Sequence, residues 1–72
     1  MYNEVIRQLR KEKNLTQQQL ANAIGYSESM VRKWESGKKK PGFDALIALS
    51  KFFGVPVGYV MGVEDWWNFK IY

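Results

Sequence analysis

The feature that most constrains this chain is the very short segment, Gly25 and Tyr26, between two stretches with helical periodicity. Gly25 is expected to end the first helix, because glycine adopts the left-handed conformation at little cost. Ser27 then supplies an N-cap for the next helix, in which Val31 and Trp34 are three residues apart and share the buried face. A link this short forces the two helices to cross steeply.

Apolar residues at helical spacing predict five short helices, over about residues 3–12, 17–24, 28–36, 43–53 and 56–61. Thr16 and Gln19 have the spacing of a capping box at the start of the second helix. Pro56 is expected in the first turn of the fifth. The side chains expected in the core are Val5, Ile6, Leu9, Leu20, Ala21, Ile24, Val31, Trp34, Leu46, Ile47, Leu49 and Phe53. The sequence therefore predicts an all-α domain with one small core.

The composition excludes several classes of function. The chain of 72 residues has no cysteine and no histidine, so it lacks thiolate metal ligands, disulfides and the commonest general base. Its seven carboxylates form no tight local cluster, and we expect no metal, no cofactor and no enzymatic activity. No apolar stretch approaches the roughly 20 residues of a membrane helix, and the N-terminus lacks a signal sequence. The expected location is the cytoplasm.

Positive charge is concentrated in one segment. Five cations stand between residues 32 and 40 against the single carboxylate of Glu35, so this segment alone accounts for the net charge of +4. A run of this kind is compatible with an ordinary solvated surface. It is also compatible with a nucleic-acid footprint, because clustered lysines and arginines gain affinity by releasing counterions from the phosphate backbone.

A larger set of residues at fixed spacing carries a family resemblance. These residues are Ile6-Arg7-Gln8-Leu9-Arg10, Leu15-Thr16-Gln17, Leu20-Ala21, Gly25-Tyr26-Ser27, Val31, Trp34-Glu35-Ser36-Gly37, Pro41, Leu46, Leu49, Gly54-Val55 and Met61-Gly62. With them, residues 3–62 resemble the Cro/phage-repressor type of helix-turn-helix domain, also called the xenobiotic-response-element family. The resemblance implies a compact five-helix, repressor-like DNA-binding domain over residues 1–62, with the helix-turn-helix in the second and third helices.

The resemblance also implies roles for individual residues. The third helix would read base edges in the major groove through Glu28, Ser29 and Lys33, with Arg32 on the same face. The DNA phosphates would be contacted by Gln17, Lys38, Lys39, Lys40 and the backbone amides of Gly42 and Phe43. Arg10 and Glu35 match a structural ion pair between the first and third helices. Gly42 stands where the family commonly has a capping Ser, Thr or Asp.

Two of the base-reading residues have alternative roles. Glu28 can accept a hydrogen bond from cytosine N4, or it can form an i,i+4 pair with Arg32 that only orders the helix. Lys33 can donate to guanine O6 and N7, or it can contact a phosphate without reading sequence. Met30 flanks this face and is expected to pack at its edge.

The predicted function is that of a sequence-specific DNA-binding transcription regulator, a repressor or Cro-like switch. Proteins of this kind usually bind a pseudo-palindromic operator in double-stranded DNA as homodimers. A small-molecule ligand is not indicated. The alternative is a helix-turn-helix scaffold for protein–protein contact, such as an antitoxin or an adaptor.

Residues 63–72 form an aromatic extension beyond the family core. Its large rings are Trp66, Trp67, Phe69 and Tyr72. Three roles remain open for this segment: a dimer contact, a fold-back that covers Phe52 or Tyr59, and a truncated linker to a C-terminal domain.

Overall fold

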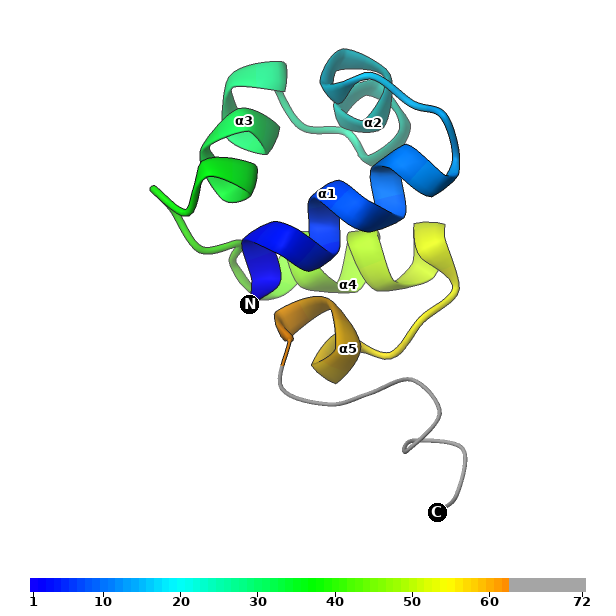
Figure 1. Ribbon diagram of the computed structural model, residues 1–72, viewed down its shortest axis with the longest axis vertical. Helices are drawn as coiled ribbons and strands as arrows, with labels where there is room; N and C mark the ends of the chain where they lie inside the picture. Colours follow the sequence, from blue (N-terminus) through cyan, green and yellow to red (C-terminus); the bar gives the residue numbers. More distant parts are fainter. Residues whose placement is uncertain (63–72) are drawn as a thin grey trace.

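A computed structural model describes residues 1–62, and over this range the chain is all-helical. The helices are α1 (Tyr2–Glu12), α2 (Gln17–Ile24), α3 (Glu28–Ser36), α4 (Phe43–Phe53) and α5 (Val57–Met61). In Figure 1, α1 lies across the centre of the domain, with α2 and α3 above it and α5 below. The all-α class and the five helices confirm the prediction from the sequence.

The N-termini of α2 and α3 are closed by the side chains that the sequence indicates. The Thr16 hydroxyl accepts from the Gln19 backbone N–H at 3.0 Å, and the Gln19 side chain accepts from the Thr16 N–H at 2.8 Å. Ser27 accepts from the Met30 N–H at 3.2 Å. Each cap satisfies N–H groups that have no partner within the first turn of a helix, so these two helices begin at defined residues.

The link between α2 and α3 has the geometry expected of a tight helix-turn-helix. Gly25 is left-handed, with φ +81°, a conformation that would strain any residue with a side chain. The next amide, of Tyr26, returns to the carbonyl of Ala21 at 2.9 Å. The Tyr26 ring then meets the Trp34 ring edge to face, with centroids 5.2 Å apart. The turn is thereby fixed against the core side of α3.

All five helices contribute to the core, which differs from the predicted core at six positions. Val5, Ile24, Ile47 and Phe53 are half-buried rather than buried, while Ala45 and Val60, which were not predicted, are buried. The buried apolar residues are Ile6, Leu9, Leu20, Ala21, Val31, Trp34, Ala45, Leu46, Leu49 and Val60. In so small a domain each helix turns only a narrow face toward the centre, so residues at the edge of the apolar stripe stay partly exposed.

The two ends of the described chain pack against each other beside α5. Pro56 is the N-cap of α5 rather than part of its first turn, so that prediction was wrong by one residue. At the other end Gly62 is left-handed, and a Cβ on it would lie 2.9 Å from the Cα and the carbonyl carbon of Met1. Glycine is therefore required there both by its φ of +80° and by the approach of the Met1 backbone.

Two kinds of feature are absent from residues 1–62. No helix in this range is both long enough and apolar enough to cross a bilayer. Within the same range, no three His, Cys, Asp or Glu side chains gather in a way that could hold a metal ion.

Candidate nucleic-acid interface

α3 separates buried apolar residues from exposed polar ones on its two faces. Val31 and Trp34 are buried in the core. Ser29, Arg32 and Lys33 are exposed on the opposite side. With Ser36 and Lys38, these three line a shallow open hollow of about 220 Å³. Three of the five lining side chains carry a positive charge, so this surface is suited to a polyanion.

Glu35 also belongs to α3, but it points inward and is only 2% exposed. Arg10 donates to both of its carboxylate oxygens, from Nε at 2.7 Å and from Nη2 at 3.0 Å. Gln17 donates to Oε1 at 3.1 Å. Arg10 also donates from Nη1 to the Leu15 carbonyl at 2.7 Å. The Arg10–Glu35 pair therefore joins α1, the α1–α2 loop and α3.

The surroundings of Arg10 shift its protonation equilibrium. The hydrogen bond to Glu35 raises the pKa of Arg10 above its ordinary value, while burial of the guanidinium acts against this rise. A raised folded-state pKa means that the stabilisation is fully present below the ordinary arginine range and is lost only as the pH rises through the raised value. Arg10 therefore stays charged at every pH at which this domain is handled.

Arg7 and Tyr2 hold the C-terminal end of α3, a role that sequence reasoning missed. Arg7 donates from Nη2 to the backbone carbonyl of Glu35 at 2.8 Å, and its Nε lies 3.8 Å from the Glu35 carboxylate. The Tyr2 hydroxyl donates to the Gly37 carbonyl at 3.3 Å. These carbonyls lack helical partners, and a cation near them is favourable. The presence of Arg7 in the family motif was the only sequence signal for this role.

At the other end of α3, Glu28 is placed near Arg32. The Arg32 Nη2 lies 3.6 Å from the Glu28 carboxylate, and both side chains keep substantial exposure, 59% for Arg32 and 41% for Glu28. A pair this open is weak, and either side chain can leave it for another partner. The geometry is thus compatible both with the helix-ordering role and with base reading.

Gln17 lies at the start of α2 and is half-buried. Its amide nitrogen is engaged with Glu35, as described above, so the side chain braces α3 in the absence of DNA. A backbone N–H of the first turn of α2 remains a candidate donor to phosphate from the same position.

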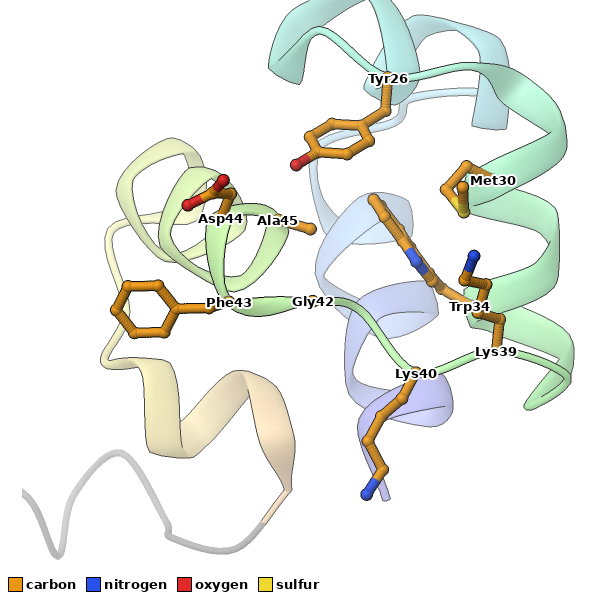
Figure 2. Close-up of a pocket in the computed structure, with 9 residues that line it drawn as sticks. All are labelled: Tyr26, Met30, Trp34, Lys39, Lys40, Gly42, Phe43, Asp44 and Ala45. Carbon is orange, nitrogen blue, oxygen red and sulfur yellow. The ribbon is translucent and has the colours of Figure 1, made fainter.

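The basic loop comprises Lys38, Lys39 and Lys40, which are all exposed. It joins α3 to α4, and Gly42, the N-cap of α4, makes no side-chain cap hydrogen bond. The first amides of α4 are therefore open to an external acceptor. The Phe43 side chain is 75% exposed. Figure 2 shows this ring pointing away from α3.

The structure thus places Ser29, Arg32 and Lys33 around one hollow with Lys38, and Lys39, Lys40, Gly42 and Phe43 around a second one, while Arg10 and Glu35 line neither. The aromatic residues predicted for a dimer contact, Trp66, Trp67, Phe69 and Tyr72, lie outside the described residues.

Comparison with known proteins supports the assignment of the fold. Residues 6–60 match the profile of a family described as Helix-turn-helix. This chain belongs to that helix-turn-helix family. The match covers most of α1 and all of α2, α3 and α4, and it agrees with the resemblance to the Cro/phage-repressor type.

Several curated helix-turn-helix relatives are similar to the chain. The HTH-type transcriptional activator BcrR of Enterococcus faecalis is 44% identical over 64 residues, which are 89% of this chain and 31% of BcrR. The uncharacterized HTH-type transcriptional regulator YobD of Bacillus subtilis is 42% identical over 65 residues, 90% of this chain and 58% of YobD. The cryptic phage CTXphi transcriptional repressor RstR of Vibrio cholerae is 37% identical over 65 residues, 90% of this chain and 59% of RstR.

The chain therefore spans between about a third and three-fifths of the length of these three relatives. The similarity covers the helix-turn-helix domain that they share with this chain. No solved structure gives a significant match.

Proposed function

We propose that this protein is a sequence-specific DNA-binding transcription regulator of the repressor or Cro-like kind. In this proposal α3 enters the major groove of the operator. Ser29, Arg32 and Lys33 reach base edges, and Glu28 joins them when it leaves Arg32. The three named relatives, one activator, one uncharacterized regulator and one repressor, support transcription regulation as the general function.

The observation that carries the proposal is the separation of charge on α3. Its only buried charged residue, Glu35, is neutralised from α1, whereas Arg32 and Lys33 stand exposed beside Lys38 around the shallow hollow. The cations of this outer face form no ion pair with Glu35, whose ion-pair partners come from α1, so they are available to an external polyanion. The bound phosphates of a DNA duplex supply the compensating negative charge.

Phosphate contacts are assigned to the two ends of this surface. On one side stands the start of α2 with Gln17, and on the other stand the basic loop and the open amides at Gly42 and Phe43. These contacts fix the register of α3 on the duplex and carry no sequence information themselves. Two such contacts on either side of α3 hold the helix at a constant depth in the groove.

The proposal includes a homodimer on a pseudo-palindromic operator. A two-fold dimer places its two α3 helices about one turn of DNA apart, roughly 34 Å, which sets the spacing of the half-sites. The aromatic segment 63–72 follows α5 directly and is the proposed source of the dimer contact. If deletion of residues 63–72 leaves the solution mass unchanged at micromolar concentration, this part of the proposal is wrong.

The experiment that tests the function is a selection from random duplexes with the purified chain at moderate salt. We expect an inverted repeat to be enriched, with half-sites about one helical turn apart. A Lys33→Ala chain run in parallel should change the enriched base at one position of each half-site. Absence of any enriched sequence, for a chain shown to be folded, would overturn the proposal in favour of the partner-binding scaffold.

The salt dependence of binding is an independent way to distinguish DNA binding from binding of a protein partner. Several phosphate contacts make the affinity fall steeply between 50 and 200 mM salt, by about a thousandfold for six contacts. Binding of a protein partner through aromatic residues would change little over the same range.

A further inference from the structure

A second and larger hollow lies between α3 and the start of α4. It has a volume of about 360 Å³ and is lined by the Tyr26, Met30 and Trp34 side chains, by Lys39 and Lys40, and by residues 42–45 of α4. Figure 2 shows the Trp34 indole between α3 and the start of α4, with both lysines on the loop that joins these helices. This hollow is separate from the base-reading face, which is lined by other α3 residues.

The indole N–H of Trp34 is a donor without an acceptor in residues 1–62. The side chain is only 1% exposed, and its N–H makes no hydrogen bond to any other described residue. Every side-chain nitrogen or oxygen that is fully sealed from solvent in residues 1–62 has a hydrogen-bond partner. The indole nitrogen must therefore reach the solvent edge of the core. Trp34 lines the hollow there, so its N–H is available to a ligand. At the solvent edge this N–H can exchange water for an acceptor of a bound ligand.

Positively charged groups lie along one end of the same hollow. The first turn of α4 lines it, and Gly42 provides no side-chain cap for the amides of that turn. A helix N-terminus carries partial positive charge, and Lys39 and Lys40 add to it. Asp44 also lines the hollow and opposes an anion. In Figure 2, however, the Asp44 carboxylate lies on the Tyr26 side, well apart from the two lysines. The end of the hollow beside Trp34 and Lys39 therefore suits an oxyanion, whereas the Lys40 side chain extends away from it in Figure 2.

We propose that this end of the hollow binds one phosphate of the DNA backbone, and that the Trp34 indole N–H is one of its donors. The remaining donors are the first amides of α4 and the ammonium group of Lys39, while Lys40 adds positive charge to the same loop. This assignment rests on the proposed DNA-binding function and adds to it a residue of the core face of α3. Trp34 then links the core to the duplex: a single side chain both packs the domain and positions α3 along the strand.

The direct test is the NMR signal of the indole N–H. The chain has three tryptophans, so the Trp34 signal is identified as the one that is missing when benzothienylalanine, which has no indole N–H, stands at position 34, with Trp66 and Trp67 left in place. Addition of the selected operator should move this signal downfield and slow its exchange with water, because a charged acceptor strengthens the hydrogen bond. Inorganic phosphate, at matched ionic strength, should move it in the same direction but only weakly, because it lacks the rest of the duplex.

A matched substitution tests the energetic role. Replacing Trp34 with benzothienylalanine puts sulfur in place of the N–H and keeps the shape of the ring, so the core stays filled. We expect operator affinity to fall about tenfold, the size of one hydrogen bond to a charged group, with unchanged melting temperature. A Tyr26→Phe chain is the control, because it removes a hydroxyl from the Asp44 side of the same hollow. It should change affinity less than twofold.

Replacing one operator phosphate at a time with an uncharged methylphosphonate identifies the phosphate that Trp34 contacts. Single methylphosphonates placed along the operator should weaken the wild-type chain at each contacted phosphate. At one of these positions the benzothienylalanine chain should show no further loss, since both changes remove the same interaction.

Each outcome has a distinct meaning. Operator binding with an unmoved indole signal and unchanged affinity of the variant overturns the phosphate site and leaves the proposed function intact. A signal that inorganic phosphate saturates and the operator leaves unmoved overturns the assignment to DNA and makes this a site for a free anion. Failure to bind any duplex overturns the function and this site together.

Discussion

Glu28 and Glu35 stand on the same helix, seven residues apart, in opposite physical situations. Glu35 is 2% exposed and takes hydrogen bonds from Arg10 and Gln17. Glu28 keeps 41% of its side-chain exposure and lies 3.6 Å from one flexible arginine. The first carboxylate is held by neighbours from two other elements, whereas the second, within residues 1–62, pairs with Arg32 of its own helix. Charge on α3 is therefore structural at one end and available at the other.

The difference follows from desolvation. A carboxylate removed from water must be compensated by well-placed donors, and the loss of one partner leaves an uncompensated charge. An exposed carboxylate keeps its water, so its pair contributes little and can be exchanged for another partner. Substitutions on either side of this contrast should consequently separate folding from binding.

The largest effect is expected from Arg10→Ala. It leaves Glu35 buried without its bidentate partner, so the free energy of unfolding should fall by about 3–5 kcal/mol. Urea denaturation followed by circular dichroism measures this fall, and operator affinity should drop only in proportion to the folded fraction. An Arg10→Ala chain that melts normally but no longer binds DNA would contradict the structural assignment. Glu35→Ala should lower the free energy of unfolding by a similar amount.

The next effect is expected on binding rather than on folding. Lys33→Ala should weaken the operator by about 1–3 kcal/mol and relax base preference at one position, with an unchanged melting temperature. Lys38→Ala, from the same hollow, is the comparison for a phosphate contact. Competition with single-base operator variants distinguishes the two, because an equal loss on every sequence would make Lys33 a phosphate contact as well.

Arg7→Ala should have an intermediate effect on stability. Its guanidinium is 45% exposed, so the ion pair with Glu35 adds little, and the main loss is the hydrogen bond to the Glu35 carbonyl at 2.8 Å. We expect a fall of about 1 kcal/mol in the free energy of unfolding. Arg7→Lys should recover only part of it, because the single lysine nitrogen cannot occupy the positions of both Nη2 and Nε. If Arg7→Ala lowered the free energy of unfolding as much as Arg10→Ala, the distinction between a buried and an exposed partner of Glu35 would be wrong.

Glu28→Ala should change stability least, by less than about 0.5 kcal/mol. The informative measurement for this substitution is its effect on DNA binding. If Glu28 only orders α3, its removal frees Arg32 and raises affinity slightly on all sequences. If Glu28 reads cytosine, preference at one base pair disappears. Selection with the Glu28→Ala chain, compared with an Arg32→Ala chain, decides between these roles.

Much of the fold could be predicted because it depends on neighbours in the sequence. Thr16, Ser27 and Gly25 act within a few residues of themselves, so the ends of α2 and α3 were predicted where they occur. The core was predicted less well. Ile47 and Phe53 have the right hydrophobicity but stand at the edge of the face that α4 turns inward, whereas Ala45 lies nearer its centre. The periodicity of the sequence identifies the apolar face of each helix, and tertiary packing decides how many residues of that face are buried.

The candidate site divides in the same way. The sequence by itself determined which side of α3 carries cations, because the opposite side is fixed by Val31 and Trp34. Only the tertiary structure decided that Arg7 reaches the end of α3 and that Trp34 lines a hollow beside the start of α4. These are contacts between elements distant in the chain. Their distances depend on how whole helices pack against one another, which no local spacing of residues encodes.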